Sequence, residues 1–233
     1  MTNLIVTGTS TEVGKTIATA CLAALASAAG MKVAVCKPAQ TGITDGESGD
    51  LDVISRLVPG VTTVEFARYP EPLAPLTAAR RSGRPTLTLE GVVEKIRELN
   101  AVHDLVLVEG AGGVLVQLGD GGFTVRDIAA ELSAPCVIVA APGLGTLNHT
   151  ALTVEALHAR NIVIAGIILG AWPRNPDLAM QCNRHDLPAV TGENVVGEIP
   201  AGVGESEWDN FAQSVTAWFD TQFRRTYLAQ RDT

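Results

Sequence analysis

A glycine-rich stretch near the start of the chain carries residue types that bind phosphate. It runs from Gly8 to Thr16, between an apolar run that predicts a strand and an alanine-rich run that predicts a helix. In such a loop, backbone N–H groups and the positive end of the helix dipole face a bound polyphosphate. Lys15 is placed to reach the β- and γ-phosphates, and the Thr16 hydroxyl to ligate Mg²⁺. Five residues rather than the usual four separate Gly8 from Gly14, but the strand–loop–helix setting favours nucleotide binding over a plain glycine turn.

Acidic side chains later in the chain are candidates for ligands of that Mg²⁺. Glu109 follows the apolar residues 105–108 and is expected at the end of a buried strand, where P-loop enzymes offer an acidic group to the metal. The alternative is a strand-terminal carboxylate that faces water. Asp50 is a further candidate, although an Asp in a first helical turn is also favoured by the helix dipole. Asp45 and Asp52 compete with Asp50, and the sequence leaves the choice among the three open.

A lysine follows a second apolar run. Residues 31–37 predict an interior strand, and Pro38 is expected to end it, so that Lys37 lies at the strand's carboxyl end. Ligands of open α/β sheets bind at that edge. A buried ammonium group needs a charged partner or a cleft, and we expect an anion as the partner of Lys37.

Alternating strands and helices must position these side chains. Apolar runs predict further strands at residues 4–7, 104–109, 136–140, 162–169 and 195–199. Helical patterns are present at residues 16–29, 50–57, 88–100, 124–132, 146–159, 177–185 and 206–223, with a proline-bearing excursion at 70–84. The alternation implies an α/β fold: a single P-loop NTPase-type domain with a mostly parallel central sheet and helices on both faces. We expect this domain at residues 1–225 and a frayed tail at residues 226–233.

The composition is that of a globular chain with a small aromatic content. Of 233 residues, 46% are hydrophobic and the formal net charge is −8, so we expect neither nucleic acid nor an anionic membrane as a partner. No apolar run approaches membrane length, and no signal segment precedes the first strand, so we expect a cytoplasmic protein. The four cysteines have no C-x-x-C or metal-site spacing and are expected to be reduced core thiols: Cys21, Cys36, Cys136 and Cys182.

The motifs occur in an order that resembles the ATP-dependent dethiobiotin synthetase family. Besides the loop, the chain has Lys37-Pro38 followed by a hydroxyl at Thr41, and Val-Glu-Gly-Ala-Gly-Gly at residues 108–113. Leu-Gly-x-Leu-Asn-His stands at residues 144–149 and Gly-Glu-Ile-Pro at residues 197–200. No single motif is specific, but the set is, and it is spread over most of the chain.

The resemblance implies closure of a ureido ring. In that family, 7,8-diaminononanoate takes up CO₂ as a carbamate, ATP phosphorylates the carbamate, and the neighbouring amine expels phosphate. Carbamate and γ-phosphate repel each other, so the reaction needs cations and oriented donors around both. By resemblance, Lys15 and Lys37 supply the charge, and Thr11 and Thr41 the hydrogen bonds. The resemblance also implies ATP as co-substrate and Mg²⁺ as cofactor, held by Thr16, Asp50 and Glu109.

The family pattern further implies which residues line the nucleotide. Some relatives have an Asn after the long β-branched run, where this chain has Gly170-Ala171-Trp172, so the choice between ATP, CTP and other nucleotides stays open. We expect the base reader to be loose. The expected nucleotide-binding residues are Glu12, Val13, Gly14, Lys15, Thr16, Ile17, Asp50, Glu109, Gly110, Ala111, Gly112, Gly170, Ala171, Pro200, Ala201, Gly202 and Glu207.

The resemblance also implies a two-fold homodimer with composite active sites. A turn opens the helix predicted after residue 145, and the free N–H groups of a helix start suit a carboxylate. By resemblance, this turn in a second copy of the chain holds the substrate's carboxylate; an ordinary turn within one subunit is the alternative. Together with Lys37 and Thr41, the expected substrate-binding residues are Gly145, Thr146, Leu147 and Asn148.

Two other functions stay open at this stage. A nucleotide-switched ATPase that positions plasmids or division machinery shares this sheet and loop, but typically has a second lysine near the loop's start, where this chain has Thr9 and Ser10. A synthetase that amidates or cyclises another acid is the more serious rival, because the loop does not identify the substrate.

Overall fold

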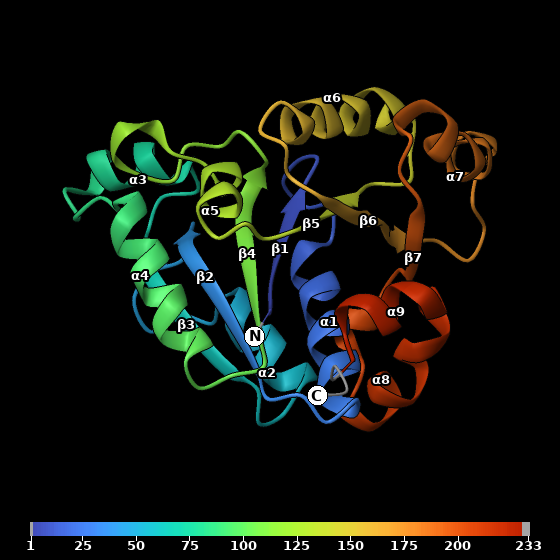
Figure 1. Cartoon of the computed structure of the whole chain (residues 1–233), viewed down its shortest axis with the longest axis horizontal. Coiled ribbons are helices and arrows are strands. Elements are labelled where there is room, and N and C mark those ends of the chain that lie inside the picture. Colours follow the sequence, from blue (N-terminus) through green and yellow to red (C-terminus); the bar gives the residue numbers. More distant parts are fainter. Residues whose placement is uncertain (1, 230–233) are drawn as a thin grey trace.

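Seven strands form one parallel sheet, of which the alternation of strands and helices predicted six (Figure 1). A computed structural model describes residues 2–229 of the chain. The strands lie in the order β3-β2-β4-β1-β5-β6-β7, and each neighbouring pair is parallel. Their bounds are β1 (Thr2–Gly8), β2 (Val33–Thr41), β3 (Thr62–Tyr69), β4 (Leu105–Gly113), β5 (Cys136–Ala140), β6 (Ile164–Trp172) and β7 (Val195–Pro200).

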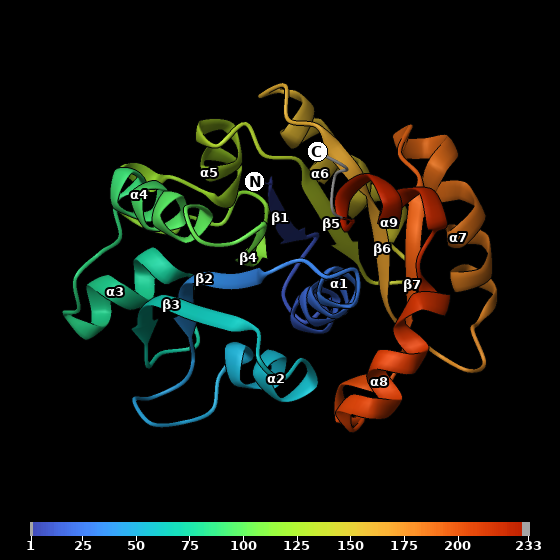
Figure 2. The same cartoon turned by 60° about the horizontal axis from the view of Figure 1, so that its bottom comes forward.

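Helices cover both faces of this sheet. Figure 2 shows α1, α2 and α8 on one face and α4, α5 and α6 on the other. Within residues 2–229, no helix has both the length and the apolar character needed to cross a membrane. The helix bounds are α1 (Lys15–Ala28), α2 (Asp50–Leu57), α3 (Pro75–Ser82), α4 (Leu89–Asn100), α5 (Val125–Glu131), α6 (Thr146–His158), α7 (Leu178–Thr191), α8 (Trp208–Val215) and α9 (Thr221–Tyr227).

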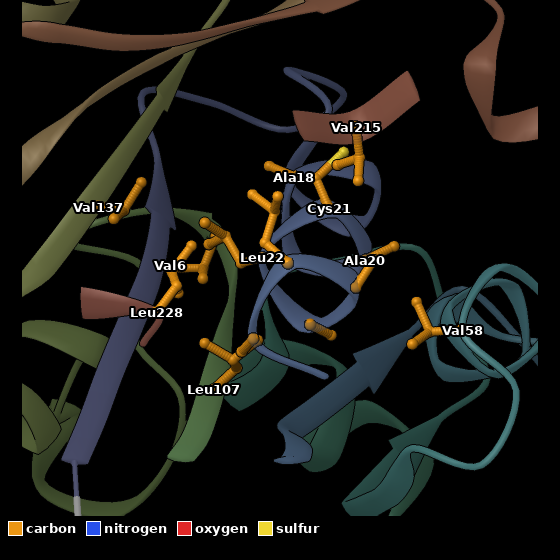
Figure 3. Close-up of a cluster of buried hydrophobic side chains, with 14 of the residues drawn as sticks. Val6, Ala18, Ala20, Cys21, Leu22, Val58, Leu107, Val137, Val215 and Leu228 are labelled. Atoms are coloured by element: carbon orange, nitrogen blue, oxygen red, sulfur yellow. The ribbon is translucent and has the colours of Figure 1, made fainter. Parts of the chain in front are cut away.

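Alternate residues of the central strands contribute to two separate hydrophobic cores. Val6 and Leu107 pack with Leu22 of α1 on one face, as Figure 3 shows. Ile5 and Val108 belong to the core on the opposite face, beneath α4, α5 and α6. Strands that are buried on both faces need no polar residues in alternation. This is why β1 and β4 appear in the sequence as continuous apolar runs.

Strand β2 continues past Pro38, so the prediction that this proline ends the strand was wrong. Pairing between β2 and β4 stops at Cys36 and Val108, whereas pairing between β2 and β3 continues to Thr41. Pro38 therefore lies where β2 has a neighbour on one side only, and a proline that lacks an N–H group is tolerated at such a position. Strand β4 likewise continues beyond Glu109 to Gly113, which pairs with Gly8 of β1 after an irregularity in the register.

Strand β3 has no counterpart among the predicted strands. It lies at the edge of the sheet, and seven of its eight residues are only partly buried. Its sequence mixes Thr, Glu and Arg with apolar residues, so it has neither a continuous apolar run nor a regular alternation of apolar and polar residues. A partly exposed edge strand gives a weak sequence signal for this reason.

The carboxyl-terminal segment forms two helices, whereas the sequence predicted one closing helix at residues 206–223. Between α8 and α9 the chain becomes extended at Phe219, which forms a bridge with Gly197 of β7. The Asp220 N–H donates to the Val196 carbonyl at 2.9 Å, and the Asp220 side chain then caps α9. Pairing with the edge of the sheet therefore interrupts the helix.

Two smaller expectations also need correction. Helix α9 extends to Tyr227 and Leu228 is 2% exposed, so packed structure continues beyond the expected boundary at residue 225. The last part of the expected tail, residues 230–233, lies outside the described residues. All four cysteines are free, but Cys182 is exposed on α7 and is not a core thiol.

The end of β6 lies directly against the glycine-rich loop. A Cβ atom added at Gly170 would lie 2.1 Å from the Val13 carbonyl oxygen, and one added at Gly14 would contact the Gly170 backbone at 3.5 Å. Real side-chain atoms never approach a backbone oxygen so closely. Gly170 is therefore required for β6 to support the loop, whatever else it contacts.

We expect Gly170→Ala to destabilise the fold by about 1–3 kcal/mol, as other overpacked sites do. Chemical denaturation of wild type and variant measures this difference. Gly143→Ala is the matched control, because a Cβ there meets nothing within 4 Å. Equal stability of Gly170→Ala and wild type would show that loop and strand separate without cost.

Candidate nucleotide and substrate site

The glycine-rich loop has the shape of a phosphate cradle. Glu12 and Gly14 both have positive φ angles, 57° and 94°, and these turn the backbone before the start of α1. Gly14 is the N-cap of α1 and no side chain caps this helix, so its first N–H groups are open to a ligand. The Lys15 ammonium group donates across the loop to the Ser10 carbonyl at 2.8 Å. The loop thus presents donors and a cation at one end of the sheet.

Lys37 and Glu109 are adjacent at the point where β2 and β4 separate. They directly follow Cys36 and Val108, the last paired residues of the two strands. The Lys37 Nζ atom lies 2.7 Å from Glu109 Oε1, and Lys37 is 4% exposed while Glu109 is fully buried. The sequence predicted an anionic partner for this lysine, and the structure shows it to be a carboxylate of the chain itself.

Glu109 has one oxygen atom that remains available. Its Oε1 atom accepts hydrogen bonds from Lys37 and, at 3.0 Å, from the Thr16 hydroxyl. Its Oε2 atom is buried and has no hydrogen-bond partner among the described residues. A buried carboxylate oxygen without a partner is costly, and a metal ion or a ligand donor would satisfy it. The alternative that Glu109 simply faces water is therefore wrong.

The three aspartates that compete as metal ligands have different surroundings. Asp45 accepts two hydrogen bonds from Arg84, at 2.8 and 2.7 Å. Asp52 accepts the Gly49 N–H at 2.6 Å and so caps α2. The Asp50 carboxylate instead forms an ion pair with Lys37. Of the three, Asp50 is the one that lies beside Lys37 and Glu109.

These charged side chains line one cavity of about 830 Å³. Its polar end is formed by the loop, Lys37, Asp50 and Glu109, and its other walls include apolar side chains from the segment before α3. Such a cavity can hold a polar reacting group at one end and an aliphatic chain along its wall. The predicted site residues that line it are Thr11, Glu12, Gly14, Lys15, Thr16, Ile17, Lys37, Thr41, Asp50, Glu109, Ala111 and Gly112.

The two lysines of this cavity have opposite pKa shifts. Burial lowers the pKa of Lys15 to about 8, and the nearby Lys37 charge contributes in the same direction. Burial also disfavours the charged form of Lys37, but the Glu109 and Asp50 carboxylates outweigh it and raise the pKa of Lys37 above its ordinary value. The two carboxylates thus favour the charged form of Lys37, whereas burial disfavours the charged form of Lys15.

The other predicted site residues lie outside the lining of this cavity. The Val13 side chain is 5% exposed and packs in the core, and Gly110 packs against Val125. Ala171 follows Gly170 and has a positive φ of 52°. The Ala201 N–H donates to the Trp172 carbonyl at 2.8 Å. This hydrogen bond joins the loop after β7 to the end of β6. The remaining residues outside the lining are Gly145, Thr146, Leu147, Asn148, Pro200, Gly202 and Glu207.

Sequence reasoning missed one residue that supports the site. Gln40 is 4% exposed, and its side-chain oxygen accepts the Asp50 N–H at 3.1 Å. It therefore anchors the start of α2 beside β2. A polar residue within a strand gives no distinctive signal in the sequence, because polar residues also occupy the strand positions that simply face solvent. The apolar wall residues Pro72, Leu73 and Val116 were also not predicted.

Solved structures with the same fold include a septum site-determining protein and a ParA family ATPase. The septum site-determining protein MinD of Pyrococcus horikoshii OT3, complexed with Mg-ADP, aligns with a TM-score of 0.58 and 18% identity over 98% of this chain and 93% of its own. A ParA family ATPase of Chlorobium tepidum TLS aligns with a TM-score of 0.56 and 15% identity over 97% and 92%. At this identity the likeness concerns the fold alone.

Sequence comparison identifies the family. The model of the AAA domain family AAA_26 matches residues 2–202. The ATP-dependent dethiobiotin synthetase BioD of Rhodococcus jostii (strain RHA1) is 56% identical over 99% of this chain and its own full length. The proteins of the same name from Rhodococcus erythropolis and Streptomyces avermitilis are 59% and 52% identical, over 94% and 98% of this chain and 96% of each relative. The chain therefore belongs to the ATP-dependent dethiobiotin synthetase family, as its motifs predicted.

Proposed function

We propose that the cavity between the glycine-rich loop and α2 brings a carbamate and the γ-phosphate of ATP together for closure of a ureido ring. The first amine of 7,8-diaminononanoate attacks CO₂ and loses a proton, which gives the carbamate. A carbamate oxygen then attacks the γ-phosphorus and ADP leaves. The second amine attacks the carbonyl carbon of the resulting anhydride and loses a proton, and phosphate leaves. The observation that carries this proposal is the buried Lys37, held by two carboxylates in the same cavity as Lys15.

The two lysines have separate roles in this proposal. Lys15, at the start of α1, binds the phosphates together with the loop N–H groups. Lys37 lies between the carbamate and the γ-phosphate, so its charge offsets the repulsion between the two anions. Thr11 and Thr41 line the same cavity and donate hydrogen bonds to the transferred group and the substrate.

Magnesium is the cofactor that the polar end of the cavity suits. The Thr16 hydroxyl, Asp50 and Glu109 would hold it, and the buried Glu109 Oε2 atom without a partner supports this assignment. Mg²⁺ is commonly bound by one or two carboxylates together with phosphate oxygens and water, so no larger cluster of ligands is needed. When bound, the ion neutralises charge on the phosphates.

The base of the nucleotide lies, in this proposal, between the end of β6 and the loop after β7. Gly170 and Ala171 form one side, and Pro200, Ala201 and Gly202 the other, with Glu207 nearby. The hydrogen bond from Ala201 to Trp172 supports this arrangement because it holds the two segments together. Both sides offer mainly backbone groups, which is consistent with a loose base reader.

The substrate's carboxylate is bound by a second copy of the chain in this proposal. The α6 start, Gly145–Asn148, has no side-chain cap and does not line the cavity of its own chain. The adjacent Leu144 is 91% exposed, as expected for a residue that a partner covers. A two-fold dimer would then complete each cavity with the partner's helix start.

We expect Lys37→Gln to impair the chemical step more than nucleotide binding. The rate of dethiobiotin formation should fall by about 10²–10³-fold. It is measured by mass spectrometry of the product, with diaminononanoate, bicarbonate, Mg²⁺ and saturating ATP present. The ATP dissociation constant from calorimetry should change little. Lys32→Gln, at an exposed position directly before the same strand, is the matched control, and thermal unfolding checks that both variants are folded. A collapse in ATP affinity with an intact rate at saturation would contradict the assigned role.

Glu109→Gln tests the metal assignment. The Mg²⁺ concentration for half-maximal activity should rise by roughly tenfold or more. The reason is that the amide lacks the negative charge of the carboxylate and has only one oxygen atom to offer to the ion. Asp104→Asn makes the same change of charge near the opposite end of β4, where its carboxylate accepts the Lys32 N–H, and should leave the requirement unchanged. If Glu109→Gln has the wild-type Mg²⁺ requirement, Glu109 is not a ligand.

A mixing experiment tests the composite site. Lys37→Gln and Asn148→Asp homodimers should each be weak, the second because a new carboxylate faces that of the substrate. After subunit exchange, each heterodimer has one doubly altered site and one intact site, and should show up to half of the wild-type activity. Absence of recovery, with exchange verified by native mass spectrometry, would place Lys37 and the α6 start in the same subunit's site.

A further inference from the structure

Arg56, an exposed residue of α2, is bonded to the loop that follows β7. Its two terminal nitrogens donate to backbone carbonyls of this loop, to Ser206 at 3.1 Å and to Gly204. Arg56 lies in the last turn of the same helix whose first residue, Asp50, contacts Lys37. A single short helix therefore contacts both the polar end of the cavity and the loop after β7.

This loop has few other polar attachments. Within the described part of the chain, both hydrogen bonds that join residues 203–206 to another element come from Arg56; the remaining ones are turns inside the loop. Its apolar contacts are made by Val203, which packs against the hydrophobic core, and by Gly204, where an added Cβ would lie 2.7 Å from the Ile17 side chain of α1. Gly202 has a positive φ of 85°, so the chain bends sharply as it leaves β7. The Arg56 guanidinium is thus the main polar tether of the loop.

We propose that Arg56 is a positioning residue for the nucleotide base. It holds the loop after β7 against α1 and α2, so that Pro200, Ala201 and Gly202 keep the place that base binding requires. This inference rests on the proposed function, which puts the base at that loop. A guanidinium suits the role because its planar donors reach two carbonyls at once and it stays charged, whereas the single ammonium of lysine is less well matched to this geometry.

Arg56→Ala tests this inference by comparing two ligands that differ in the base. The dissociation constant of ATP should rise by roughly five- to twentyfold, the equivalent of about one lost hydrogen bond to a charged group. The dissociation constant of inorganic tripolyphosphate, measured with the same Mg²⁺ concentration, should stay within about twofold. KM for ATP should rise while kcat and KM for diaminononanoate hold, and Arg56→Lys should recover part of the ATP affinity.

Two further measurements separate a local tether from a general effect. Arg160→Ala removes a guanidinium that pairs with Asp127 on another face, and should leave both affinities unchanged. Hydrogen exchange of residues 200–207 without nucleotide should become faster in Arg56→Ala and not in Arg160→Ala. This readout depends on the tether alone and not on where the base binds.

Three results would overturn the inference, each for a different reason. Equal weakening of ATP and tripolyphosphate would make Arg56 a general contributor to anion binding. Unchanged hydrogen exchange would show that Arg56 does not hold the loop. Faster exchange with unchanged ATP affinity would show that the tether exists but that the base binds elsewhere, which is a failure of the proposed base site.

Discussion

The arrangement of this site depends on a buried ion cluster at the point where two strands separate. Burial of a carboxylate or an ammonium costs several kcal/mol per ion unless each is paired. Glu109 is fully buried and is held by Lys37 and Thr16, while Asp50 supplies the second anion to Lys37. The cluster therefore joins the start of α1 to β2, β4 and α2. Because one Glu109 oxygen has no partner, the cluster is nearly but not fully satisfied by the chain itself, which is the state expected of a site that receives a ligand.

Small residues allow the surrounding elements to approach the loop. Gly170 places the end of β6 in contact with Val13 and Gly14. Helix α1 has five alanines that are at most 1% exposed: Ala18, Ala20, Ala23, Ala24 and Ala26. Alanine keeps high helix propensity and lets the helix axis lie close to the sheet. The aromatic content of 4% is consistent with this architecture, since large rings in the centre would hold α1 and the strands apart. The ring contacts gather instead in the carboxyl-terminal helices.

The sequence predicted most of the buried framework because buried parallel strands and alanine-rich helices give strong local patterns. The fold class is confirmed, α2 begins and ends where expected, and β5 matches its predicted bounds. Local patterns failed where a distant partner decided the outcome. Pro38 remains within a strand because β3 continues beside it, and the closing helix breaks because Phe219 and Asp220 pair with β7. The same reason explains the site: Lys37 and Glu109 were identifiable as chemistry-bearing residues, but their direct contact follows from strand register, which no local pattern encodes.

A fold of this kind does not determine function by itself, because function depends on the side chains of the site. MinD and ParA proteins align with this chain at 15–18% identity, which is enough for the strand order and too little for a shared site. A parallel sheet brings the carboxyl ends of its strands to one edge whatever the sequence. At that edge this chain has a lysine on β2 beside a glutamate on β4, directly after the last residues at which the two strands pair. At that position the two charged side chains face a cavity instead of a neighbouring strand. The divergence of β2 from β4 therefore opens a place, at the carboxyl ends of the strands, where an anion and a cation can bind together away from water.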